Sequence, residues 1–106
     1  MRETNFQAIY KKAFKIALIK AVENDVETGD NWFPCGRAFL KLPANTKFGR
    51  WLKKNNLASK NYPTGLSIYP PNLNTQKLSV YKAWADEFSA VLSSNNIRNT
   101  VESYWD

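Results

Sequence analysis

Apolar residues recur at intervals of three and four positions through the first part of the chain, which is the spacing of one buried helical face. The predicted face carries Phe6, Ile9, Tyr10, Ala13, Phe14, Ala17, Leu18, Ala21 and Val22. Thr4 followed by Gln7 has the pattern of a capping box, so we expect the helix to begin near Asn5. It is predicted to fade in the acidic stretch 23–30.

At 37–42, small or aliphatic residues occupy every second position, which predicts a half-buried strand that Pro43 ends. Its predicted inner side carries Ala38, Leu40 and Leu42, and its outer side carries Arg37, Phe39 and Lys41. A second strand is predicted at 65–69, where Pro70 stops it. A last strand is predicted from Ile97 towards Trp105.

Two more helices are predicted, a short one at 47–55 and a longer one at 77–94. Thr46 is a suitable N-cap for the short helix. Both helices are followed by an Asn-Asn pair, and asparagine tolerates the left-handed conformation that ends many helices. We therefore predict a Schellman-type stop with Asn56 and with Asn96 in that conformation.

The predicted last strand places large aromatic side chains on both of its faces. Val101 and Trp105 share one face, and Tyr104 lies on the other. We expect Trp105 to be buried against the first helix near Phe14 and Leu18, where it would contribute about 3 kcal/mol. The alternative is that Trp105 is an exposed contact for a partner.

These elements predict a single α+β domain over residues 1–106. Three helices would pack on a small three-stranded sheet, in the order helix–strand–helix–strand–helix–strand. Helical connections between successive strands favour parallel pairing with right-handed crossovers.

The composition argues against most enzyme classes, because the chain has no histidine and one cysteine. Cys/His zinc sites and nucleophiles activated by histidine are therefore excluded, and we expect no catalytic residue, metal or cofactor. Arg37 or a helix N-terminus could activate Cys35, but we favour a small buried residue that opens a strand. Gly36 would permit a tight start to that strand.

Carboxylates occur in two places that need an interpretation. The acidic stretch contains Glu23, Asp25, Glu27 and Asp30. Close carboxylates can bind a divalent cation, but the order of residues in a calcium loop is missing, so we favour a solvated helix end. Asp86 and Glu87 are explained by helical propensity.

The positive charge is concentrated in the middle third of the chain. Residues 31–60 contain seven cations and no acid, whereas the chain as a whole has a net charge of +6. The seven cations are Arg37, Lys41, Lys47, Arg50, Lys53, Lys54 and Lys60. A field of one sign over one segment indicates an anionic partner, and we expect these residues to bind the phosphate backbone of a nucleic acid. A plain solvated face or a charged protein-binding face remains the alternative.

The short helix at 47–55 should be amphipathic in an unusual way. At 100° per residue, Phe48, Trp51 and Leu52 point in one direction and its four cations point away from them. We therefore interpret Trp51 as an anchor to the sheet and not as a residue that stacks on bases. Such a charged surface holds phosphates but does not read bases.

Tyrosines near the basic segment offer a second kind of contact. Tyr62, Tyr69 and Tyr81 flank loops rich in proline and asparagine. Exposed tyrosines beside a basic groove can stack on unpaired bases. We favour the interpretation that Tyr62 and Tyr69 pack beside the sheet.

From Cys35 onward, the chain resembles a family of uncharacterised small bacteriophage proteins with a "CGFAWV"-like strand. The corresponding pieces here are "CGRAFL" at 35–40, "NYPTGLSIY" at 61–69, "TQKLSVYKAWADEF" at 75–88 and "SYWD" at 103–106. This resemblance implies a small phage protein that acts in the cytoplasm of an infected bacterium. It implies no particular activity.

The sequence therefore predicts an accessory protein that binds nucleic acid without base specificity. The alternative is a protein–protein interaction module, or an inhibitor of a host bacterial machine, that uses the same cations against an acidic host protein surface. No apolar run is long enough to span a bilayer, and the first residues lack the pattern of a secretory signal, so we expect an intracellular protein without a membrane partner.

Overall fold

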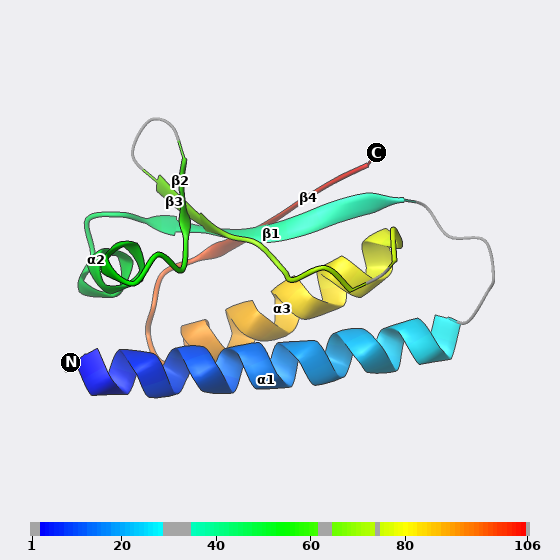
Figure 1. Ribbon diagram of the computed structural model, residues 1–106, viewed down its shortest axis with the longest axis horizontal. Helices are drawn as coiled ribbons and strands as arrows, with labels where there is room; N and C mark the ends of the chain where they lie inside the picture. The colour runs from blue at the N-terminus through cyan, green and yellow to red at the C-terminus, as the bar shows by residue number, and fades with distance from the viewer. Residues whose placement is uncertain (1–2, 29–34, 62–64, 74, 106) are drawn as a thin grey trace.

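The computed structural model describes residues 3–28, 35–61, 65–73 and 75–105, and these form three helices and four strands (Figure 1). In chain order the elements are α1 (Glu3–Thr28), β1 (Gly36–Pro43), α2 (Lys47–Lys54), β2 (Ser59–Asn61), β3 (Gly65–Ile68), α3 (Leu78–Ser94) and β4 (Thr100–Trp105). The α+β class and the three helices are confirmed. The predicted number of strands and the strictly alternating order are wrong.

The four strands form one antiparallel sheet in the order β2-β3-β1-β4, with β1 in the middle. The expected parallel pairing of successive strands is wrong. The strand that follows α2, β2, runs in the same direction as β1, but β3 lies between them and pairs with both in the opposite direction.

The strand that the sequence did not reveal is β2, which consists of the three residues Ser59, Lys60 and Asn61. These residues pair with Ser67, Leu66 and Gly65 of β3. Because the strand is short and polar, it shows no alternation of apolar and polar positions. It extends the sheet by backbone pairing with β3, and its sequence has no side-chain pattern from which a strand could be predicted.

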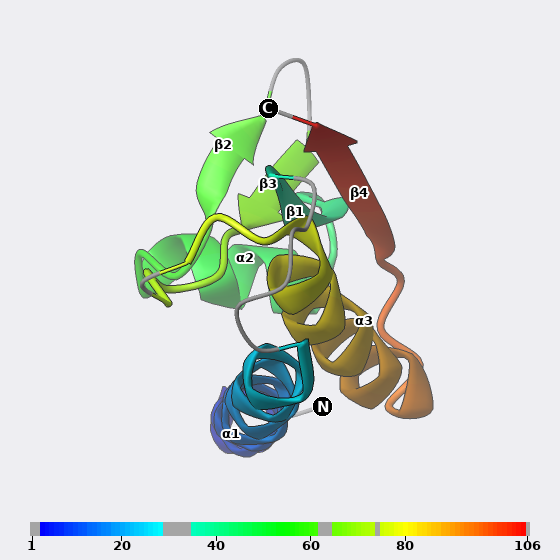
Figure 2. The same cartoon turned by 90° about the vertical axis from the view of Figure 1, so that its right-hand side faces the viewer.

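The molecule has three layers, formed by the sheet, α3 and α1 (Figures 1 and 2). Helix α3 packs against β1 and β4, and α1 packs against the far side of α3. Helix α2 lies below the β2–β3 end of the sheet, on the same side as α3. No helix among the described residues covers the opposite face, which we call the open face.

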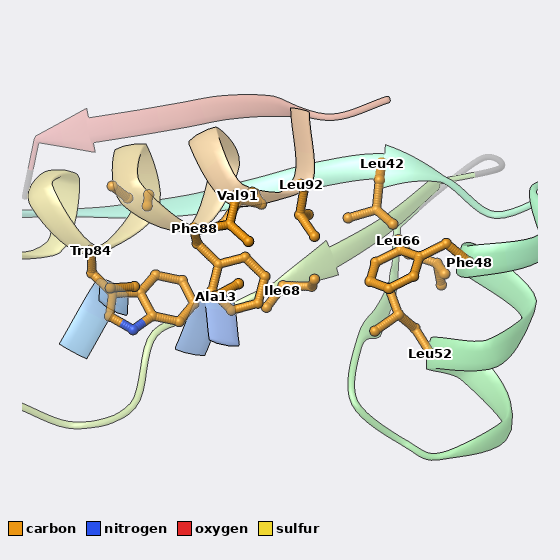
Figure 3. Close-up of a cluster of buried hydrophobic side chains, with 14 of the residues drawn as sticks. Ala13, Leu42, Phe48, Leu52, Leu66, Ile68, Trp84, Phe88, Val91 and Leu92 are labelled. Atoms are coloured by element: carbon orange, nitrogen blue, oxygen red, sulfur yellow. The ribbon is translucent and has the colours of Figure 1, made fainter. Parts of the chain in front are cut away.

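The layer between α1 and α3 is built from small residues on one helix and large ones on the other. Ala13, Ala17 and Ala21 of α1 are completely buried and recur every four residues. Their small side chains allow close approach of α3, whose Trp84 and Phe88 fill the space (Figure 3). The predicted burial of the α1 face is thereby confirmed for the three alanines along its centre.

Val22, however, is 52% exposed, so its predicted burial is wrong. It lies about 100° around the helix from Ala21, on the flank of the alanine stripe. In addition, α1 has 26 residues and α3 has 17, so the last turns of α1 have less of a partner to pack against. The helix ends at Thr28, within the stretch 23–30 where it was predicted to fade.

Helix α2 closes the core at one end of the sheet. Phe48 and Leu52 point towards Leu42 and Leu66 of the sheet (Figure 3), and the Phe48 ring lies 5.3 Å from that of Phe6 in α1. The predicted N-cap is confirmed, because the Gly49 amide donates to Thr46 Oγ1 over 3.0 Å. The predicted burial of the α2 aromatics is confirmed, since Phe48 and Trp51 are 3% and 7% exposed. The Trp51 ring lies beside Phe6 and Tyr10 of α1, so its anchoring to the sheet stays a prediction.

Both predicted Schellman stops are confirmed. Asn56 and Asn96 have φ angles of 56° and 60°. The following amides, of Leu57 and Ile97, donate to carbonyl oxygens five residues earlier over 2.9 and 3.0 Å. Because Ile97 belongs to this helix stop, the last strand begins at Thr100 and not at the predicted position.

On β4, the prediction that Val101 and Tyr104 lie on opposite faces is confirmed. Val101 is partly buried against the core, and Tyr104 is 48% exposed on the open face. The backbone of Trp105 pairs with Gly36. The predicted contact of Trp105 with Phe14 and Leu18 concerns a side chain outside the described residues.

Within the described ranges, no helix is both long enough and apolar enough to cross a membrane.

Candidate nucleic-acid interface

Helix α2 presents the densest group of positive charges. Lys47, Arg50, Lys53 and Lys54 are exposed, and the apolar residues of the same helix are buried. Arg50 Nη2 donates to the Asn45 carbonyl over 3.1 Å, which directs its guanidinium along the helix surface. The predicted amphipathic arrangement of α2 is confirmed. Two of these cations, Lys53 and Lys54, also lie in the last turn, where they complement the helix dipole.

The other three predicted site residues lie on the sheet. Arg37 and Lys41 are exposed on β1, at positions that alternate with its buried residues, so both lie on the open face. Lys60 pairs with Leu66, which is buried on the helix-covered side. Because paired residues share a face, Lys60 belongs to that side, at the edge near α2.

The structure thus divides the seven predicted cations into two groups. Lys60 and the four cations of α2 form the helix-side group, whereas Arg37 and Lys41 form the open-face pair. A nucleic acid that contacted both groups would have to pass around the β2 edge of the sheet.

The open-face pair lies beside three aromatic side chains, which come from β1, from β4 and from the residue that follows β3. The Phe39 ring of β1 lies 5.1 Å from the Tyr69 ring, with 31° between the ring planes, and 6.2 Å from the Tyr104 ring of β4. Tyr69 and Tyr104 are 51% and 48% exposed. We call these three residues the aromatic strip. Tyr104 pairs with Arg37 and not with Phe39, so the strip crosses the open face obliquely to the strands.

Arg37 also borders an open pocket of about 620 Å³. Its guanidinium lies over the Tyr81 ring of α3, 4.9 Å from the ring centre, so the Arg37 side chain starts from the open face but reaches towards the helix layer. The pocket is lined by Arg37, Pro70, Pro71, Asn72, Thr75, Gln76 and Tyr81. Its walls include the segment that directly follows Tyr69, so the pocket adjoins one end of the aromatic strip.

A second hollow of about 490 Å³ lies between α1 and α2, where Lys11 and Lys54 are among the lining residues. Lys11 thereby joins the helix-side group. Sequence reasoning missed this residue because it lies far from the basic segment along the chain. Lys11 comes close to the cations of α2 because α1 packs against α2.

The three tyrosines that the sequence indicated have different environments. Tyr69 packs beside the sheet as expected but keeps half of its surface exposed. Tyr81 is 1% exposed and its hydroxyl donates to the Thr75 carbonyl over 2.7 Å, so it does not present a free ring face to solvent. Tyr62 lies outside the described residues. Sequence reasoning did not propose Phe39 or Tyr104 as base contacts, although it placed both outward.

Cys35 is exposed and pairs through its backbone with Lys77, so the expected burial of Cys35 is wrong. Gly36 does open β1 in tight surroundings. A Cβ at this position would overlap the Tyr104 carbonyl oxygen and lie 3.1 Å from Leu78 Cδ1. The predicted need for glycine is confirmed, and its cause is the close approach of β4 and α3.

The acidic stretch in α1 is engaged by lysines. Glu23 lies 3.5 Å from Lys20 Nζ, and Asp25 lies 2.9 Å from Lys77 Nζ. Asp30, at the end of this stretch, lies outside the described residues. Asp86 and Glu87 lie on α3. Among the residues that the structure describes, no three His, Cys, Asp or Glu side chains are grouped so that they could hold a metal ion.

Comparison of this chain with protein-family models, with curated proteins and with solved structures finds no match.

Proposed function

We propose that this protein binds nucleic acid through the phosphate backbone, without base specificity. The observation that carries the proposal is the charge distribution of α2. Its cations are all exposed, its aromatic residues are all buried, and no acid lies in residues 31–60 to offset the charge. Surface helices ordinarily mix both signs. An unbalanced cationic face repels itself, and an anionic ligand offsets that repulsion.

The helix-side group supplies most of the proposed phosphate contacts. Lysine ammonium groups bind phosphate oxygens as point charges, and Arg50 adds planar donors. Such contacts fix the position of the backbone and do not distinguish bases. Their free energy comes largely from released counterions, so binding should weaken steeply with salt.

Fluorescence anisotropy with random single- and double-stranded oligonucleotides across a salt series tests the proposal. If about five phosphates are neutralised, a plot of log affinity against log salt should have a slope of roughly −4 to −5 on duplex DNA. A protein that binds neither oligonucleotide at low salt would end the proposal.

A charge-reversal variant locates the contact. We expect Lys53→Glu with Lys54→Glu to reduce the affinity strongly and to reduce the steepness of the salt dependence by about two units. Both residues are exposed, so the fold should persist. The matched control is Lys12→Glu with Lys82→Glu, which makes the same change in net charge at exposed positions of α1 and α3. Equal losses in both variants would show that net charge matters and α2 does not.

A protein-binding function is the second candidate, and it is supported by an exposed aliphatic ridge on α1. Ile19, Val22 and Val26 are 48%, 52% and 76% exposed and follow helical spacing. In the phage context that the sequence resemblance implies, the partner would be an acidic surface of a host protein. Pull-down from bacterial lysate, with and without nuclease, separates the two candidates. A stoichiometric protein that survives nuclease and is lost in the α2 charge reversal favours this one.

A further inference from the structure

The aromatic strip exposes much more ring surface than packing of the sheet requires. In an antiparallel sheet with one buried face, the other face is ordinarily polar. Here Tyr69 and Tyr104 each leave about half of their surface to solvent, and both contact Phe39 between them. These rings come from β4, from β1 and from the residue that follows β3, so only the folded sheet brings them together.

Charges surround this strip in an arrangement that suits a phosphate chain. Arg37 and Lys41 lie on either side of Phe39 along β1, with about 13 Å between their Cα atoms. Arg37 pairs with Tyr104 across the strands, and Lys41 pairs with Thr100, which is exposed, and with Ser67, which is completely buried. Glu102, opposite Phe39, adds one negative charge to the same face.

We propose that the aromatic strip stacks the bases of a single-stranded nucleic acid, while Arg37 and Lys41 hold the phosphates on either side of Phe39. The inference rests on the proposed function and adds its substrate class, which is an unpaired strand. Bases of a duplex are already stacked on each other, so their faces are not available to the strip. Every base has a π-face, so this contact also reads no sequence.

Single-stranded DNA and RNA should bind comparably. Ring stacking and phosphate contacts involve neither the 2′-hydroxyl nor the thymine methyl group. The pocket beside Arg37 lies next to Tyr69 and gives the strand a continuation beyond the rings. Glu102 should oppose the phosphates, so its carboxylate weakens the binding that the two cations promote.

The decisive experiment compares single strands that have equal charge and differ in their bases, and it adds a duplex as a ligand without free base faces. Anisotropy is measured with oligothymidylate, oligouridylate, a strand of abasic sites of the same length, and a duplex. Stacking of one base on an aromatic residue should strengthen binding by about fivefold to a hundredfold. We therefore expect both base-bearing single strands to bind at least about fivefold more tightly than the abasic strand.

Substitutions then assign the difference to the strip. Tyr69→Ser and Tyr104→Ser should each remove most of the advantage of the base-bearing strand and leave the abasic strand unchanged. Phe39→Ser should do the same, but Phe39 is more buried, and thermal unfolding of each variant checks the fold. Glu102→Gln should strengthen binding of both strands. Ala90→Ser, at an exposed position on α3, is the control and should change neither.

Each outcome has one meaning. If the abasic strand and the duplex bind as tightly as oligothymidylate, stacking is overturned while the proposed phosphate binding stands. If base-bearing strands bind more tightly but the tyrosine variants keep that preference, the strip only supports the sheet and the inference is wrong. If no strand binds at low salt, both the inference and the proposed function fail.

Discussion

The ammonium group of Lys77 lies 2.9 Å from the carboxylate of Asp25, and this ion pair joins the start of α3 to the last turns of α1. Asp25 is partly exposed, so the pair is screened by water and should contribute no more than about 1 kcal/mol. We expect Asp25→Asn to lower the free energy of unfolding by up to this amount, and the loss should shrink at high salt. Urea unfolding at two salt concentrations measures it.

The control for this ion pair is Glu27→Gln, two residues further along α1. Both changes remove a negative charge near the C-terminal end of the helix, where the helix dipole disfavours acids. Only the first breaks the contact with Lys77. Equal effects of the two substitutions would show that the contact contributes nothing.

The two asparagines with positive φ should respond in the same way to substitution. Glycine adopts the left-handed conformation freely, so Asn56→Gly and Asn96→Gly should leave the stability unchanged or raise it slightly. Alanine at either position should lower the free energy of unfolding by about 1 kcal/mol. Thermal unfolding of the four variants checks this, and an alanine variant as stable as its glycine counterpart would contradict the assigned geometry.

Gly36→Ala should destabilise the protein and also disturb the open face. The added Cβ would press on the Tyr104 carbonyl oxygen, so β4 must shift and carry its side chains with it. Overpacking of this kind costs about 1–3 kcal/mol. Chemical denaturation gives the stability, and the preference for base-bearing over abasic strands reports the position of Tyr104. Stability equal to that of the unsubstituted protein would mean that the close approach relaxes easily.

Alkaline conditions should reveal the environment of Tyr10. Burial raises the pKa of its phenol above the ordinary value of 10.0. The unfolded chain therefore loses this proton first, and the native protein loses stability as the pH rises from about 10 through the higher folded pKa. In Tyr10→Phe this contribution is absent. The stability difference between the two proteins should be constant below pH 10 and shift in favour of phenylalanine above it.

The helices could be predicted from the sequence because their signals are local. The alanine and aromatic spacing of α1, the Thr46 cap and the two Asn-Asn stops each lie within a few residues of the structure they determine. Strand direction depends instead on distant segments. Nothing near Leu40 indicates that it pairs with Ile68 on one side and Val101 on the other.

For the candidate site too, local features could be predicted from the sequence, whereas contacts between distant segments could not. The alternation along β1 predicted that Arg37, Phe39 and Lys41 point outward, and the structure places all three on the open face. Their neighbours could not be foreseen, because the positions of Tyr69 and Tyr104 beside Phe39 depend on the strand register. The exposure of Tyr81 was misjudged because the segment that precedes α3 folds over it and accepts its hydroxyl hydrogen bond.

Along β1, residues that hold the fold and residues that face the proposed ligand alternate one by one. Ala38, Leu40 and Leu42 are at most 4% exposed, and their neighbours 37, 39 and 41 point the other way. Exchanges at the three outward positions can therefore change what the sheet recognises while the interior keeps its packing. The three outward positions of this strand are therefore suitable for a combinatorial library. Two copies of such a protein could come to bind different ligands through changes at these positions alone.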